Sequence, residues 1–185
     1  MRFRGVSEIE PMYKQYSADK ILANSREYWP DVVDDDVECF AIYLHRSHEL
    51  LLKHAMQTVQ HHPINSSEFD VLASLRNSAP PYVLTPTELQ RSLLITSGGL
   101  TKLFYQLEAR GLIARSVQEH DKRSKLVHLT VAGKELVEEC MDEVYKFERD
   151  LLDSALSKKE QTQLNNLLGK VTRELEARDG QFTDE

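Results

Sequence analysis

The chain has 185 residues, of which 41% are hydrophobic and 29% charged, and its formal net charge is −7 at pH 7. This composition is that of a globular protein, and we expect residues 1–185 to form one domain. The sequence has no apolar stretch of about 18 residues, and its first segment, MRFRGVSEIEPMYK, has no apolar core. We therefore expect a cytoplasmic protein that neither enters a membrane nor carries a secretory signal peptide.

The negative charge is unevenly distributed along the chain. Residues 1–84 carry 8 Lys and Arg and 12 Asp and Glu, residues 85–130 carry 7 and 4, and residues 131–185 carry 8 and 14. The middle segment alone is basic, with a net charge of +3. If the chain binds a polyanion, it binds through this segment, while the acidic flanks keep other surfaces away.

Amphipathic helices account for much of the first half of the chain. Apolar side chains recur at close to a 3.6-residue period over 37–59, after the acidic run DVVDDD. A further helix is expected at roughly 66–78, because Asn65 and Glu68 have the spacing of a capping box and Pro80-Pro81 prevents its continuation.

Two short helices come next, separated by only a few residues. Thr85 as cap, Pro86 as first residue and Glu88 as capping-box partner predict a helix at about 86–92. A second helix is expected near 97–108, with Gly111 as its C-terminal stop. Its apolar side chains share one face: Leu100, Leu103, Phe104 and Leu107. Two such helices with a short connection make a helix-turn-helix.

The opposite face of the second helix has the chemistry of a DNA-reading surface. Hydroxyl groups and a lysine near a helix N-terminus suit phosphates and base edges in a major groove, and glycine lets the backbone approach closely. The residues expected to point outward to DNA are Ser97, Gly98, Thr101, Lys102 and Tyr105. The alternative interpretation is an amphipathic helix whose polar face meets only solvent.

A strongly charged hairpin is expected directly after this helix, in GLIARSVQEHDKRSKLVHLT at 111–130. The runs LIARSV and LVHL are typical of two antiparallel strands. The loop between them forms a wing whose candidate DNA contacts are Lys122, Arg123 and Lys125, with Asp121 suited to orient Arg123 through a salt bridge. An arginine at the tip suits the narrow minor groove. A solvated charged hairpin is the alternative.

Two long helices are expected to end the chain. Thr130 begins one that reaches about residue 153, and Ser157 with Glu160 opens the last one. The apolar rows of these helices and of 37–59 are too long for a winged helix to cover, so we expect them to pack against a second copy of the chain. Such a homodimer presents two recognition helices to palindromic double-stranded DNA.

The expected fold class is thus mainly α with a small β-hairpin wing. A winged helix-turn-helix DNA-binding lobe is expected at 64–130, and a helical dimerisation region at 13–59 and 131–177.

The block TPTELQRSLLITSGGLTKLFYQLEARGLIARS through HDKRSKLVHLT resembles the MarR family of winged-helix transcriptional regulators. The shared features are the hydroxyl-and-glycine start of the recognition helix, the LEARGLI run, the D-x-R-S wing tip from Asp121 to Ser124, and the LT before the next helix. The likeness follows the order of elements over 37–175 and is most specific over 85–130. It implies a homodimer that usually represses transcription and releases DNA when a small molecule or an oxidant acts near the junction of its two regions.

The run FDVLASLRNSAPPYVLTPTELQRSLLITSGGLT is similar to the urate- and phenolate-responsive branch, which also has an N-terminal helical extension comparable to residues 13–28. This implies that Asp70 is linked to ligand binding, that Arg115 couples the pocket to the DNA-binding lobe, and that Trp29 is a candidate for the tryptophan of that branch. The branch has a further arginine in its recognition helix, and this chain has Leu103 at that position. We therefore expect a small aromatic or phenolic anion rather than urate itself.

The motif ECFAIY resembles the first helix of the organic-hydroperoxide-sensing branch, in which the cysteine is the reactive residue. At Cys39 the helix dipole favours the thiolate, whereas the preceding carboxylates oppose it. The positions at which that branch has its tyrosines fall near Lys53 and Ile64 here, and neither of these residues is a tyrosine. Peroxide sensing by Cys39 therefore stays an alternative, beside an inert and partly buried cysteine.

Other kinds of site have little support in the sequence. The five histidines between His45 and His62 lack a set of carboxylates at fixed spacing, and Cys39 and Cys140 lack metal-type spacing, so we expect neither a metal nor a cofactor. The chain lacks a nucleophile elbow and an HExxH motif, so we expect no enzyme. A helical adaptor that binds protein is the remaining alternative, and the salt dependence of DNA binding separates it from a DNA-binding protein.

Overall fold

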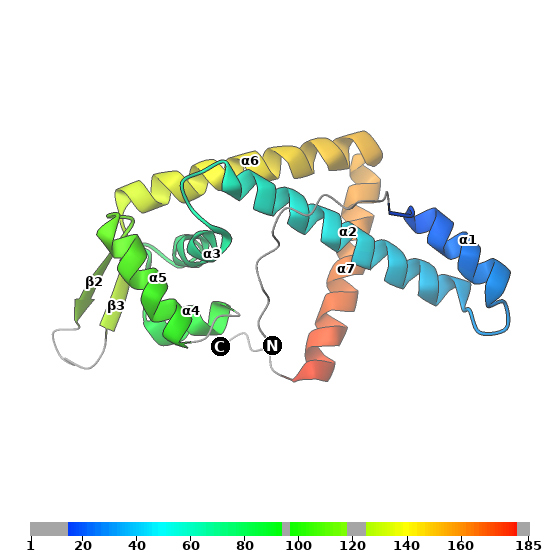
Figure 1. Ribbon diagram of the computed structural model, residues 1–185, viewed down its shortest axis with the longest axis horizontal. Helices are drawn as coiled ribbons and strands as arrows, with labels where there is room; N and C mark the ends of the chain where they lie inside the picture. Colours follow the sequence, from blue (N-terminus) through cyan, green and yellow to red (C-terminus); the bar gives the residue numbers. More distant parts are fainter. Residues whose placement is uncertain (1–14, 94–96, 118–124, 181–185) are drawn as a thin grey trace. The chain divides into compact units, whose positions relative to one another are not determined.

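The computed structural model describes residues 15–93, 97–117 and 125–180 (Figure 1). These residues form mainly α-helices and one small antiparallel sheet, as in winged-helix proteins, which confirms the expected fold class. The chain divides into two compact units, one up to His54 and the other from Ala55 onward. In the described part of the chain, no helix is long and apolar enough to span a membrane.

The first unit contains α1 (Ala18–Tyr28) and most of α2 (Asp35–Gln60), which confirms the helix expected at 37–59. Ser17 caps α1 by accepting a hydrogen bond from the Lys20 N–H at 3.2 Å. The Tyr43 hydroxyl of α2 donates to Asp19 of α1 at 2.9 Å. Within the expected N-terminal extension, the described helix covers 18–28.

The second unit contains α3 (Ser66–Arg76), α4 (Pro86–Ser92), α5 (Ser97–Ala109), α6 (Val131–Ala155) and α7 (Lys158–Asp179). The capping boxes predicted for α3, α4 and α7 are confirmed, with both reciprocal hydrogen bonds present in each. Thr130 caps α6 by accepting from the Gly133 N–H at 3.0 Å. Local side-chain chemistry therefore places the start of four of these helices.

The sheet has the strand order β1-β3-β2, with β1 (Val83–Leu84), β2 (Ile113–Val117) and β3 (Lys125–Leu129). The antiparallel pairing of β2 with β3, in which Arg115 lies opposite Val127, confirms the two strands of the wing. The sequence interpretation missed β1, because two residues are too few to show the alternation of a strand. The loop of the wing, 118–124, lies outside the described residues.

The hydrophobic core of the second unit lies among α3, α4, α5, the sheet and α6. Its fully buried side chains include Leu72, Leu75, Leu89, Leu107, Val127 and Val137. The predicted inner face of α5 is confirmed, since Leu100, Leu103, Phe104 and Leu107 are all buried. Burying a side chain of this size contributes roughly 1.5–3 kcal/mol. Packing therefore fixes which face of α5 turns outward.

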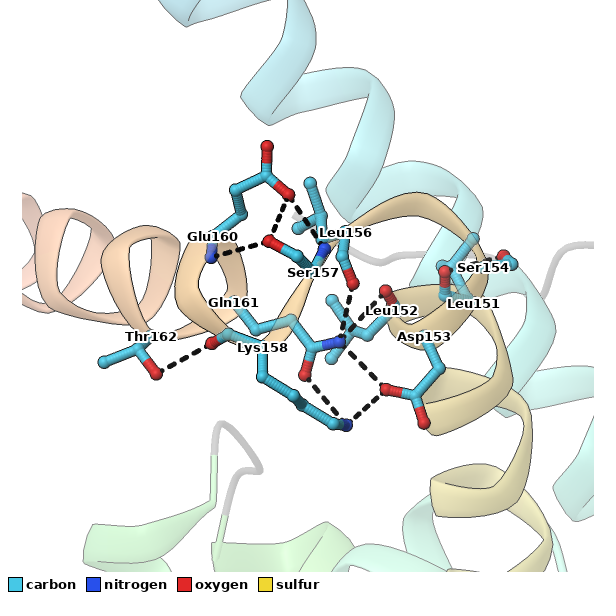
Figure 2. Close-up of polar contacts among 10 residues, drawn as sticks. All are labelled: Leu151, Leu152, Asp153, Ser154, Leu156, Ser157, Lys158, Glu160, Gln161 and Thr162. Atoms are coloured by element: carbon cyan, nitrogen blue, oxygen red, sulfur yellow. Dashed lines mark hydrogen bonds and ion pairs between the residues drawn. The ribbon is translucent and has the colours of Figure 1, made fainter.

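A network of hydrogen bonds shapes the corner between α6 and α7 (Figure 2). The Gln161 side-chain amide donates to the carbonyls of Leu152 and Leu156, both at 3.1 Å, and to Asp153 at 2.9 Å. Asp153 also pairs with Lys158. The bond to the Leu156 carbonyl pairs an acceptor at the C-terminal cap of α6, whereas the Leu152 carbonyl also accepts the Leu156 N–H at 2.9 Å. The corner is followed by a helix in which no residue is buried within the described chain.

Candidate nucleic-acid interface

The outward face of α5 carries the polar groups that the sequence placed there. Thr101 and Lys102 are exposed, and Tyr105 is 61% exposed. A Cβ added at Gly98 would have no neighbour within 4 Å among the described atoms, so the backbone is open to approach at this point. Ser97 is the first residue of α5, and its side chain lies outside the described set.

Arg115 of β2 holds two side chains of α5. Its Nε donates to Glu108 Oε2 at 2.8 Å, and its guanidinium carbon lies 4.3 Å from the centre of the Tyr105 ring. The hydrogen bond from Arg115 lowers the pKa of the Glu108 carboxyl, and Glu108 raises the pKa of Arg115 in return. Strand β2 of the wing therefore contacts the outward face of α5 through the Arg115 side chain.

The C-terminal end of α5 is joined closely to the start of α6. Gly111 adopts a left-handed backbone, with φ 69°, as predicted for the helix stop. The Thr130 hydroxyl lies within hydrogen-bond distance of the carbonyls of Gly111, at 2.7 Å, and Leu112, at 2.9 Å. A Cβ added at Gly133 would lie 2.0 Å from the Leu112 carbonyl oxygen. The two segments thus pack backbone against backbone, which requires glycine at 133.

The expected cations of the wing are only partly within the described chain. Lys125 is exposed at the first position of β3, opposite Val117. Lys122 and Arg123, with the neighbouring Asp121, lie outside the described residues. Their role as DNA contacts stays a prediction.

The three residues expected to bind a ligand have different surroundings. Asp70 is exposed on α3, yet desolvation by its neighbours raises the pKa of its carboxyl. Arg115 is engaged by Glu108 and Tyr105 of α5 rather than by Asp70. Trp29 is 67% exposed and belongs to the first unit. Whether these residues share a ligand stays a prediction.

A shallow groove between α3 and α6, with a volume of about 350 Å³, was not predicted. Apolar and polar side chains line it together, among them Arg76, Met141 and Tyr145. Arg76 bonds Glu138 at 2.5 Å and lies over the ring of Tyr82, 4.9 Å from its centre. No local pattern predicts this arrangement, because Arg76 and Glu138 are 62 residues apart.

Cys39 and Cys140 differ in their environment. Cys39 is half-buried in α2, where Arg26 Nη2 lies 3.5 Å from its sulfur and Arg26 Nε bonds Asp35 at 2.8 Å. Cys140 is fully buried in the core, and burial raises the pKa of its thiol to about 11. Among the described residues, no three His, Cys, Asp or Glu side chains gather as a metal site.

Comparisons with known proteins find similarity to transcriptional regulators. A family model described as MarR family matches residues 62–124. The HTH-type transcriptional regulator PecS of Dickeya dadantii (strain 3937) is 35% identical over 127 residues, covering 68% of this chain and 76% of PecS.

Solved structures are similar as well. A mutant of MarR from Escherichia coli in complex with operator DNA has a TM-score of 0.54 and 30% identity, with 71% of this chain and 94% of that chain covered. A structure that concerns regulation of DNA binding of Bordetella bronchiseptica BpsR by 6-hydroxynicotinic acid has a TM-score of 0.54 and 25% identity, with coverage of 70% and 90%.

Proposed function

The chain belongs to the MarR family of DNA-binding transcriptional regulators, and on this premise we propose that it is a homodimeric repressor, released from a palindromic operator by a small aromatic or phenolic anion. The observation that carries the proposal is the exposed polar face of α5 within a winged-helix fold. We assign 64–130 as the DNA-binding lobe and 13–59 with 131–177 as the dimerisation region.

DNA contact in this proposal is divided between α5 and the wing. The α5 face of Ser97, Gly98, Thr101, Lys102 and Tyr105 enters the major groove, while Lys122, Arg123 and Lys125 contact the backbone and the adjoining minor groove. Buried leucines on the inner side of α5 leave its polar face as the one available to DNA.

The test is fluorescence anisotropy on a duplex that the wild-type protein selects from a random-sequence library. Lys102→Ala is expected to weaken binding and to blur sequence preference, whereas Arg123→Ala weakens binding to all duplexes and reduces the salt slope by about 1. Lys159→Ala, an exposed lysine in the first turn of α7, is the matched control. If neither Lys102→Ala nor Arg123→Ala changes binding, these contacts are wrong; salt-independent association would favour the protein-binding adaptor.

The dimer is supported by apolar side chains that the described chain leaves uncovered. On α7 these are Leu164, Leu167, Leu168 and Leu175, and on α6 Leu151. A row of this kind is a recurrent mark of a protein interface. A twofold pair would present two copies of α5 to half-sites about one helical turn of DNA apart.

The anionic effector is supported by the relative BpsR, whose DNA binding is the subject of regulation by 6-hydroxynicotinic acid, a hydroxylated aromatic acid. We propose that the effector binds near Asp70 and Arg115 of the second unit. An effector can act only through different affinities for the DNA-competent and DNA-incompetent arrangements. Adding 6-hydroxynicotinic acid, salicylate or urate to the protein–DNA complex should therefore lower the anisotropy in at least one case; three unchanged signals would contradict this part of the proposal.

A peroxide-responsive regulator is the second candidate, and the contact between Arg26 and Cys39 favours it. A cationic neighbour is common around reactive cysteines. A mild organic peroxide should then release the wild type from DNA and leave Cys39→Ser bound. If both proteins remain bound, Cys39 is not the sensor.

A further inference from the structure

Glu68 of α3 is a buried carboxylate with two partners. The residue is 5% exposed. Its Oε2 accepts the Asn65 N–H at 3.0 Å, as the capping box requires, and its Oε1 accepts Arg110 Nη1 at 3.0 Å. A carboxylate removed from water is costly unless it is paired and hydrogen-bonded. Glu68 therefore depends on Arg110 as well as on its own cap.

The other two capping boxes show that a cap does not need such a partner. Glu88 and Glu160 are exposed, and their side chains accept hydrogen bonds within their own caps, from Thr85 and Ser157. The bond from Glu68 to Arg110, 42 residues away, thus serves something other than the start of α3.

Arg110 is the residue that directly follows α5. Its second guanidinium nitrogen, Nη2, donates to the carbonyl of Pro63. The Arg110 side chain therefore contacts both Glu68 in α3 and the segment that precedes α3. A planar fork with several donors suits such a double contact, which a lysine cannot reproduce. The C-terminal end of α5 is thereby fixed to the start of α3.

The location of this contact matters for the exposed face of α5. Lys102 lies eight residues before Arg110, which is about 12 Å along a helix. A tilt of about 10° around the fixed end would move Lys102 by about 2 Å, enough to break a hydrogen bond. Contacts with base edges are therefore sensitive to how firmly the far end is held.

We propose that Glu68 and Arg110 are positioning residues for DNA recognition: the ion pair between the buried Glu68 and the more exposed Arg110 fixes the C-terminal end of α5 against α3, so that the face with Thr101 and Lys102 meets the major groove at a defined angle. Neither residue touches DNA in this inference. It rests on the proposed entry of α5 into the major groove.

The test uses the full chain, with Glu68→Gln, Arg110→Ala and Arg110→Lys, on the selected duplex and on a scrambled duplex of the same composition. Glu68→Gln keeps an acceptor for the Asn65 N–H and removes the charge. Glu160→Gln makes the same change in a capping box that has no arginine and serves as the matched control. Circular dichroism and melting temperature establish that each variant is folded.

Glu68→Gln and Arg110→Ala should each lower affinity for the selected duplex about tenfold, with scrambled-duplex affinity and salt slope unchanged. The double variant should lose no more than either single one, and Arg110→Lys should recover part of the loss. Glu160→Gln should bind as wild type.

Three results would overturn the inference. A salt slope smaller by about 1 in Arg110→Ala would make Arg110 a phosphate contact. Unchanged discrimination between the duplexes in folded variants would make the pair purely structural, and so would additive losses in the double variant. Lys102→Ala separates the two proposals: if it has no effect, the entry of α5 is wrong, whereas if it alone weakens binding, only the positioning role fails.

Discussion

The guanidinium of Arg115 covers the ring of Tyr105 at 4.3 Å while its Nε donates to Glu108. One residue of the wing thus orders two residues of the helix proposed to read DNA. Arg115→Lys should lower affinity for the selected duplex several-fold, because an ammonium group cannot both stack on the ring and bond the carboxylate with the same geometry. Anisotropy measures this, and Arg178→Lys, in an exposed pair on α7, is the control. Equal affinity of Arg115→Lys and wild type would show that Tyr105 needs no such support.

The same pair predicts a dependence of stability on pH. Hydrogen bonding by Arg115 lowers the pKa of Glu108, so the contribution of the pair is complete above the ordinary pKa of a glutamate, about 4.3, and is lost as the pH falls through the lowered value. The melting temperature of wild type should exceed that of Glu108→Gln at pH 7, and the difference should shrink at about pH 3. A difference that is constant over this range would mean that the charge of Glu108 contributes nothing.

Glycines 133 and 98 should respond oppositely to alanine. At Gly133 the new Cβ would lie 2.0 Å from a backbone oxygen, so Gly133→Ala should destabilise the protein by about 3 kcal/mol in urea unfolding. At Gly98 the space is open, and Gly98→Ala should leave stability equal or raise it by up to about 1 kcal/mol. Gly98→Ala should still weaken DNA binding if the backbone approaches DNA there. Tolerance of Gly133→Ala would contradict the close packing of the α5–β2 turn on α6.

Local patterns in the sequence predicted most of the helices, because caps such as Thr85 with Glu88 and apolar periods act within one or two turns. They also predicted the buried row of α5 and hence its outward face. Contacts between distant segments were not predictable: Glu68 with Arg110, Arg76 with Glu138 and the short strand β1 depend on packing that no local spacing encodes.

The two cysteines should differ sharply in reactivity. Cys140 is fully buried, and its thiol pKa of about 11 leaves almost no thiolate at pH 7.5. Iodoacetamide should therefore label only Cys39 in the folded chain, and Cys39→Ser should react only after unfolding in guanidinium. Mass spectrometry of tryptic peptides counts both sites. Rapid labelling of Cys140 in the folded protein would mean that the core around α6 opens readily.

A charged residue in the exposed leucine row of α7 should show whether this row forms the dimer interface. Leu167 is 52% exposed in the described chain, so Leu167→Asp costs little within one copy. Between two copies it would place an unpaired charge in an apolar interface, which should shift the protein to a monomer in analytical ultracentrifugation and weaken operator binding at least tenfold. Lys159→Asp, on the same helix, should leave the dimer intact. A Leu167→Asp dimer as tight as wild type would exclude this row from the interface.

Asp70 connects stability with the proposed effector. Desolvation raises the pKa of its carboxyl, so the folded state favours the protonated form, and stability falls as the pH rises through the interval between the ordinary and the raised pKa. Asp70→Asn should consequently melt higher than wild type at pH 7, with the gain absent at about pH 3. If the carboxylate also faces an anionic effector, the variant should respond to a different concentration of 6-hydroxynicotinic acid in the anisotropy assay, whereas Asp142→Asn, an exposed carboxylate on α6, should respond as wild type does. A higher melting temperature with an unchanged effector response would leave Asp70 a desolvated surface residue and remove it from the proposed site.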